Sequence, residues 1–172
     1  EWGLAMRLTD VTPFPRAMTL GALEKEDYNL VYEMGSLIAK QCKALGIHIN
    51  FAPDADINLN PANPVINTRS FGQDRYRVAY LAEQYIRGMH DEGVMAVIKH
   101  FPGHGDTETD SHKSLPTISH DRNFIDTVDM YPFRYNIKQG VWGVMVGHLD
   151  VPAMNKDYNY PACINPDIVQ DY

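Results

Sequence analysis

The chain has 172 residues, which suits one domain or part of a larger one, and its 44% hydrophobic and 22% charged residues are ordinary for a globular protein. A net charge of −7 argues against a nucleic-acid or polyanion partner, and no apolar stretch approaches the length of a membrane span. No signal-peptide pattern opens the chain, which begins at Glu1 without a methionine, so cytoplasm, periplasm and cell envelope all stay open.

The hydrophobic pattern predicts three helices, each closed by a glycine and followed by a strand. The helices are expected at 25–45, 75–92 and 122–138, the last disturbed by Pro132. The strands are expected at 47–51, 94–100 and 141–148. The closing glycines are Gly46, Gly93 and Gly140, each where a glycine commonly follows a helix C-cap. Residues 1–23 are expected to be irregular, and a fourth helix is expected after Asn165, with Pro166 in its first turn.

Each predicted helix should bury one apolar stripe. The stripe of the first contains Leu30, Met34, Leu37, Ile38 and Cys42. The stripe of the second contains Val78, Leu81, Tyr85, Ile86 and Met89. Cys42 is thus expected as a small core residue, and Cys42 and Cys163 are too few for a disulfide framework.

The alternation of helices and strands predicts βα units around a parallel sheet. Polar loops follow all three strands, and in a (β/α)-barrel such loops share one rim. Because a full barrel needs roughly 250 residues, we expect residues 1–172 to form one α/β domain that is about half of a TIM-like (β/α)8 barrel, truncated at both ends. Such a half-barrel would expose apolar sheet edge, and we expect it to self-associate or to pair with its missing half.

The densest candidate chemistry lies in the loop 99–112, which follows the second strand and holds three histidines and three acidic residues. Asp110 and His112 are two positions apart, so the carboxylate can hold one ring nitrogen while the other faces a substrate. That arrangement suits a general acid/base near neutral pH. The plainer alternative is a turn in which Asp110 only caps backbone groups.

Three further side chains are candidates for binding a ligand. Lys99 and His100 are consecutive at a strand end, where successive side chains point to opposite faces, so a bulge is needed for both to reach one ligand. Arg69 is a lone arginine in the long polar loop 53–74. It either clamps a polar or anionic substrate group or pairs with a surface acid, and its spacing leaves both open.

A metal site is the main alternative for the histidine-rich loop. Plausible ligands for zinc or another divalent ion are His100, His104, Asp106, Asp110 and His112. Their spacings match no strong metal signature, and no helical His-Glu-x-x-His is present. The segment from Asp54 opens like a calcium loop, but Leu59 stands where that loop needs glycine and Val65 where it needs glutamate, which excludes it.

The run KHFPGHGDT from Lys99 to Thr107, followed by DSH from Asp110 to His112, closely resembles the signature of glycoside hydrolase family 3, in its β-N-acetylglucosaminidase subgroup. Other segments resemble the family in the right order. They are Glu1-Trp2-Gly3 with Arg7, Phe51-Ala52-Pro53 with Asp56 and Asn58, Arg69 to Gly72, and Met145 to His148. The resemblance spans essentially the whole chain.

This resemblance implies a (β/α)-barrel catalytic domain with a retaining mechanism and no cofactor, acting on terminal β-linked N-acetylglucosamine of peptidoglycan or chitin-like oligosaccharides. It makes His112 the acid/base and Asp110 its dyad partner. The sugar hydroxyls would be gripped by Lys99, His100 and Arg69, and the pocket would be lined by Asp56 and His148. The N-acetyl group has no assignable partner.

Two departures from the family pattern bear on whether this chain is active by itself. The family nucleophile is an aspartate on a later strand, beyond Tyr172, and a substrate-binding aspartate is expected just before Glu1. Because a retaining mechanism needs a nucleophile, we expect these 172 residues alone to be inactive. Phosphate in place of water is a possible variation. A metal-dependent hydrolase and a non-catalytic sugar-binding module remain as alternatives.

Overall fold

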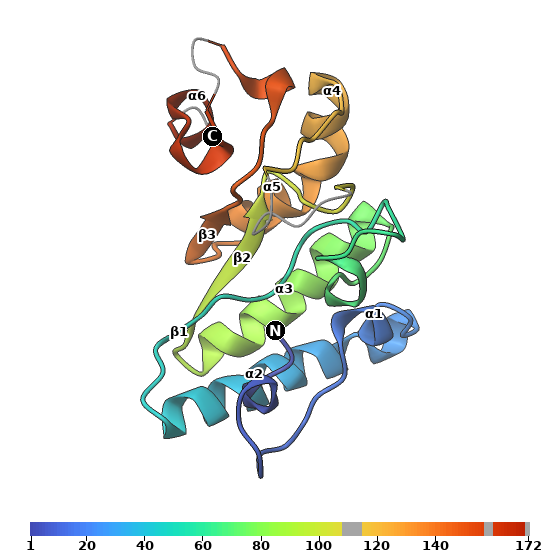
Figure 1. The fold of residues 1–172 in the computed structure, drawn as a ribbon. Helices are drawn as coiled ribbons and strands as arrows, with labels where there is room; N and C mark the ends of the chain where they lie inside the picture. Colours follow the sequence, from blue (N-terminus) through green and yellow to red (C-terminus); the bar gives the residue numbers. More distant parts are fainter. Residues whose placement is uncertain (108–114, 157–159, 171–172) are drawn as a thin grey trace.

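A computed structural model describes residues 1–107, 115–156 and 160–170 (Figure 1). Within these ranges a three-stranded parallel sheet runs in the order β1 (Ile49–Asn50), β2 (Met95–Phe101) and β3 (Gly143–Val146). Strands that follow one another in the chain are neighbours in the sheet, which is the order that successive βα units of a barrel produce. The predicted α/β class with a parallel sheet is confirmed.

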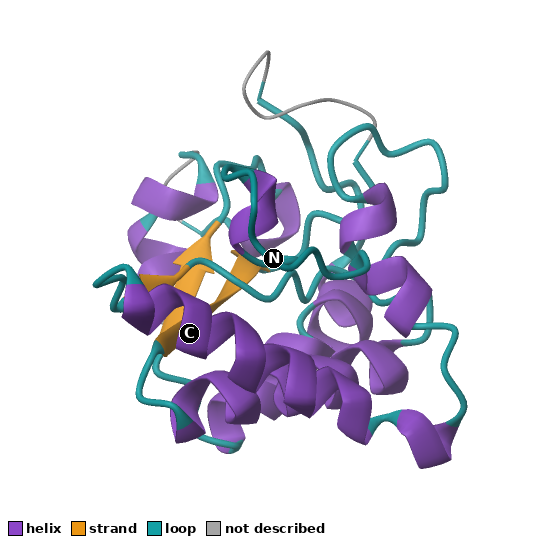
Figure 2. Cartoon of the chain, turned by 90° about the horizontal axis from the view of Figure 1, so that it is seen from below, coloured by secondary structure: helices purple, strands orange, loops and turns teal. Residues whose placement is uncertain are grey.

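Helices form a layer beside this sheet (Figure 2). The long ones are α2 (Asn29–Ala44), α3 (Arg75–Asp91) and α5 (Tyr131–Lys138), and α3 packs between α2 and α5. The shorter helical segments are η1 (Leu4–Met6), α1 (Ala17–Leu20), η2 (Lys25–Asp27), η3 (Asn67–Arg69), α4 (Arg122–Phe124), η4 (Ile125–Asp129), η5 (Pro152–Met154), η6 (Ala162–Ile164) and α6 (Pro166–Val169). The predicted fourth helix is confirmed as α6, which Asn165 caps by accepting a hydrogen bond from Asp167 N at 2.9 Å. No helix within the described ranges is both long and apolar enough to cross a bilayer.

The three predicted helix-ending glycines share one geometry. Gly46, Gly93 and Gly140 have φ angles of 72°, 77° and 84°, in the left-handed region. After α2, the amide of Gly46 donates to the Lys43 carbonyl, and the next amide, of Ile47, reaches back to Cys42. The same pair of bonds closes α3 and α5. This is the Schellman motif, and each one turns the chain directly into the next strand.

Two sequence-based details of the helices are wrong. Leu30 and Leu37 were expected in the buried stripe of α2, but they are 44% and 49% exposed. The buried stripe instead contains Val31, Met34, Gly35, Ile38, Ala39 and Cys42. The third predicted helix is three pieces, because a wide π turn over Ile125–Asp129 separates α4 from α5, which starts with Pro132 in its first turn.

The first strand is shorter than expected, and the apolar side chains at and next to it are exposed. Ile49 and Phe51 are 48% and 58% exposed, so the alternation over 47–51 does not mark a buried face in this chain. The backbone nevertheless continues along β2, since Val97 N donates to Ala52 O and Ala55 N donates to Lys99 O. This pairing brings Asp54 beside Lys99. The expected self-association through exposed sheet residues stays a prediction.

Candidate active site

The carboxylate of Glu1 joins two basic side chains that are far apart in the sequence. Arg69 donates from Nε to Oε2 at 2.9 Å and from Nη2 to Oε1 at 2.7 Å. Lys99 Nζ lies 2.6 Å from Oε1 and also donates to the carbonyl of Phe51 at 2.6 Å. Burial opposes ionisation of Glu1, but these two cations outweigh it and lower its pKa to about 2. Arg69 and Lys99 are therefore brought together by Glu1, an acid that was not among the candidates, and their expected role in binding sugar hydroxyls stays a prediction.

Lys99 and His100 both join this site because the strand is irregular there. The register of β2 against β3 shifts between Lys99 and Phe101, which is the kind of irregularity that two consecutive inward side chains require. Lys99 then reaches Glu1, and the ring of His100 reaches Asp56. The irregularity that both side chains need to reach one site is therefore present.

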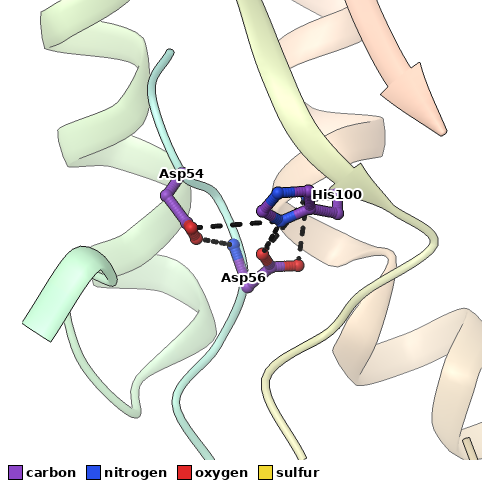
Figure 3. A group of neighbouring side chains, drawn as sticks. All are labelled: Asp54, Asp56 and His100. Atoms are coloured by element: carbon purple, nitrogen blue, oxygen red, sulfur yellow. Dashed lines mark hydrogen bonds and ion pairs between the residues drawn. The ribbon is translucent and has the colours of Figure 1, made fainter. Parts of the chain in front are cut away.

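Asp56 is fully buried and accepts N–H groups from the end of β2 and from the turn that follows it. Its carboxylate takes the backbone amides of His100 at 3.2 Å and of His104 at 2.7 Å, and it lies 2.7 Å from His100 Nδ1 (Figure 3). Asp54 lies next to it and accepts the amide of Asp56 through Oδ1 at 3.1 Å. The other oxygen, Asp54 Oδ2, is 3.6 Å from Arg69 Nη2, which links this pair to Glu1, Arg69 and Lys99, which we call the Glu1 cluster.

Burial controls the protonation states in this cluster. The pKa of His100 falls to about 4, because burial disfavours the imidazolium and the cations Arg69 and Lys99 add to that effect. His100 is therefore neutral at pH 7 and can both donate and accept a hydrogen bond. The pKa of Asp54 lies well above its usual range, because its carboxyl is buried and stands beside Asp56. These shifts leave Lys99 and Arg69 as the cations and Glu1 as their main counter-ion.

Three of these residues have the donors that a metal ion needs. Ligand atoms of Asp54, Asp56 and His100 lie within 4.8 Å of one another, and carboxylate oxygen with imidazole nitrogen suits zinc and similar ions (Figure 3). Arg69 already lies near the free oxygen of Asp54, so the protein itself supplies positive charge there. The donor types fit a divalent ion, which would have to share this space with the guanidinium.

Of the ligand set suggested for the metal alternative, the structure describes His100, His104 and Asp106, whereas Asp110 and His112 lie outside the described residues. Within the described ranges His104 and Asp106 lie outside the metal-capable group. His104 Nδ1 is 2.6 Å from Thr107 Oγ1, and the carbonyl of His104 accepts Asn63 Nδ2 at 2.8 Å. Asn63 also accepts two backbone amides with its own oxygen, so a fully buried asparagine shapes the turn that follows β2.

A second cluster, formed by Asp106, His120 and Asp129, lies at the end of the turn after β2. His120 Nε2 lies 2.8 Å from Asp106, and His120 Nδ1 lies 2.8 Å from Asp129. Burial raises the pKa of Asp129 to about 6 against the opposing effect of His120. Sequence reasoning missed His120 and Asp129, because nothing in their spacing distinguishes them from ordinary surface residues.

Three further residues were predicted for the site. Asp110 and His112, the expected acid/base dyad, lie outside the residues that the structure describes. His148 is exposed after β3, and its Nδ1 lies 3.1 Å from Cys163 Sγ. Its expected role in lining the sugar pocket stays a prediction.

These features define a class of protein. Sequential parallel strands with helices outside, and a cluster of charged side chains where β1 and β2 end, are typical of a (β/α)-barrel domain with its ligand site at the carboxyl ends of the strands. The model of the glycosyl hydrolase family 3 N-terminal domain matches residues 1–172, and the chain belongs to this family. The recognition from sequence is confirmed.

Similar proteins support this assignment. The chain is 40% identical over 159 residues to beta-hexosaminidase A of Pseudoalteromonas piscicida, covering 90% of this chain and 27% of that protein. A family 3 beta-N-acetylglucosaminidase structure from Paenibacillus aligns with a TM-score of 0.88 and 45% identity, covering 93% of this chain and 30% of that one. The structure of a beta-glucoside phosphorylase, BglX, aligns with a TM-score of 0.89 and 26% identity, covering 95% and 30%. The chain thus spans about a third or less of the length of these relatives.

Proposed function

We propose that this chain is part of a β-N-acetylhexosaminidase that removes terminal β-linked N-acetylglucosamine from oligosaccharides. The observation that carries the proposal is the convergence of Arg69 and Lys99 on Glu1 at the carboxyl ends of the strands. Glu1 holds the guanidinium and the ammonium group side by side, and the N–H groups that it leaves unbound suit the neighbouring hydroxyls of a sugar. The hexosaminidase relatives support the sugar type.

The proposed mechanism has two steps. A carboxylate attacks the anomeric carbon, the bond to the leaving oxygen breaks, and His112 gives its proton to that oxygen. Water then attacks the glycosyl-enzyme, His112 takes up a proton from the water, and the carboxylate is released. Asp110 holds His112 in the required tautomer. We propose that the nucleophile comes from residues outside these 172, so that the 172-residue chain does not turn over by itself.

The sugar is held by residues of the Glu1 cluster in this proposal. Arg69 and Lys99 donate to hydroxyls, and His100, neutral at pH 7, can donate to one hydroxyl or accept from it. Asp56 acts through the residues it binds, since it positions the ring and amide of His100 and the amide of His104. Asp56 is therefore assigned as a positioning residue.

The test uses the longest expressed chain that contains these residues and compares release of 4-nitrophenol from its β-N-acetylglucosaminide and its β-glucoside. We expect cleavage of the N-acetyl substrate, a loss of about a hundredfold or more for His112→Ala, and a raised KM for Arg69→Lys. Leu37→Ala, at an exposed position of α2, is the matched control and should leave the rates unchanged. Full activity of His112→Ala would remove the acid/base assignment.

Two other candidates are tested in the same assay. The fold similarity to a beta-glucoside phosphorylase favours phosphate as an alternative acceptor, and adding phosphate should then yield a sugar 1-phosphate. The grouping of Asp54, Asp56 and His100 favours a metal-dependent hydrolase, which a chelator would inactivate. We expect the chelator to have no effect.

A further inference from the structure

A band of tyrosines lies on the helices, separate from the Glu1 cluster. These tyrosines line two hollows, one of about 690 Å³ and one of about 340 Å³. The larger hollow is lined by Tyr28, Tyr76 and Tyr80, and the smaller by Tyr131 and Tyr135. One ring from each hollow, Tyr76 and Tyr131, pack edge to face with their centroids 5.0 Å apart. We call these five side chains the tyrosine band.

Two rings of the band are exposed, those of Tyr131 and Tyr135 are half-buried, and that of Tyr28 is buried. Tyr76 and Tyr80 are 55% and 41% exposed. The guanidinium of Arg75 lies 4.8 Å from the centroid of Tyr76 and donates to its hydroxyl at 2.7 Å, and a second bond to the carbonyl of Thr127 fixes the arginine. Ordered aromatic faces bind a ligand at a low cost in conformational entropy.

Polar groups of both charges surround these rings. Lys25, Gln73 and Asp74 line the larger hollow, and Asp126, Arg134 and Lys138 line the smaller one. Aromatic faces beside mixed donors and acceptors suit a ligand with C–H faces and hydroxyl edges, which is the chemistry of a sugar ring. Two hollows side by side suit a chain of sugars rather than a single one.

The band also adjoins the segment that carries Arg69. Ser70 donates from its hydroxyl to the carbonyl of Asp56, and it accepts the amide of Gly72, which lines the larger hollow. One rigid turn therefore presents Arg69 to the Glu1 cluster and Gly72 to the band. We propose that the tyrosine band is a second carbohydrate site that binds a β-linked glycan chain containing N-acetylglucosamine, and this inference rests on the proposed function for its sugar type.

In the experiment, the longest expressed chain that contains these residues is titrated with the hexamer of β-1,4-linked N-acetylglucosamine, and binding is measured by calorimetry. Tyr76→Ala and Tyr80→Ala should each weaken binding about threefold to tenfold, and Tyr76→Phe should restore it because the ring remains. Trp142→Ala, at a 54% exposed aromatic outside the band, is the matched control and should bind as the parent does. Circular dichroism verifies that α3 is intact in each variant.

The outcomes separate this inference from the proposed function. Hexamer binding that needs Tyr76 and Tyr80, without cleavage of the aryl glycoside, supports the band and removes the hydrolase assignment. If the aryl glycoside is cleaved but neither tyrosine substitution changes hexamer binding, the second carbohydrate site is overturned. It is also overturned if Trp142→Ala weakens hexamer binding as much as the tyrosine substitutions do. Repeating the titration with a peptidoglycan-derived tetrasaccharide shows which kind of glycan the site prefers. Tyrosine-dependent binding of either glycan supports the inference.

Discussion

His120 Nε2 lies 2.8 Å from an Asp106 oxygen, although the whole segment 107–119 separates the two residues in the chain. The other ring nitrogen of His120 lies 2.8 Å from Asp129, which packs over Gly103. One imidazole thus ties the end of the turn after β2 to η4 and closes the base of the segment that carries Asp110 and His112.

Removal of this imidazole should destabilise the fold. In His120→Ala, the largely buried Asp129 loses its partner, and we expect the free energy of unfolding to fall by about 1–3 kcal/mol. Urea denaturation at pH 7 measures the change. His48→Ala removes an exposed histidine and should cost less than about 0.5 kcal/mol. Equal losses in both variants would show that the bridge adds no stability.

Asn63 should matter to the fold far more than its position in a polar loop indicates. Its side chain is fully buried, donates to the His104 carbonyl, and accepts the amides of Val65 and Ile66. Asn63→Ala leaves these buried groups without a partner, and we expect a loss of about 2–3 kcal/mol by thermal or urea denaturation. Asn60→Ala breaks one side-chain bond, to the amide of Ala62, and should cost about 1 kcal/mol or less. A smaller loss for Asn63→Ala than for Asn60→Ala would contradict this account.

Gly105 is required by close packing of two backbones. A Cβ atom there would stand 1.6 Å from the carbonyl oxygen of Ile57, so Gly105→Ala must push the turn after β2 away from the loop that carries Asp56. We expect a loss of about 3 kcal/mol or more. Gly46→Ala meets open space but has a φ of +72°, and should cost about 1–2 kcal/mol. The melting temperatures of the two variants should therefore differ, with Gly105→Ala the lower, and the reverse order would refute the packing argument.

His100 should make stability depend on pH in a defined window. Its pKa is about 4 in the folded protein against an ordinary 6.5, so between these values the unfolded chain binds a proton that the folded chain does not. The contribution of His100 to the free energy of unfolding is therefore fully present above pH 6.5 and is lost as the pH falls toward 4. Urea denaturation at pH 7.5 and at pH 5 measures this effect. Between these pH values, the free energy of unfolding of the parent should fall by about 1–2 kcal/mol more than that of His100→Gln. A parallel pH dependence in the two proteins would show that His100 is not held neutral.

The local features of the fold follow from the sequence because they depend on neighbours in the chain. The helix-ending glycines occupy left-handed positions that other residues disfavour, and they lie where the pattern predicts them. The stripe of α3 is buried as expected at Val78, Leu81 and Met89. The stripe of α2 was misassigned because Leu30 and Leu37 have helical spacing as well, and only the packing against α3 decides which face is covered.

The sequence by itself determined the family and the parallel α/β architecture, because these depend on continuous motifs and local periodicity. It also predicted Arg69, Asp56, Lys99 and His100 as substrate-binding residues, and that role stays a prediction. Only the tertiary structure decided which charges meet. Glu1 holds Arg69 and Lys99 together, and His120 holds Asp106 and Asp129, across long stretches of chain. Such contacts depend on where β1, β2 and η4 lie in space, and no short-range spacing encodes that. The burial that makes His100 neutral is likewise a property of the packed fold.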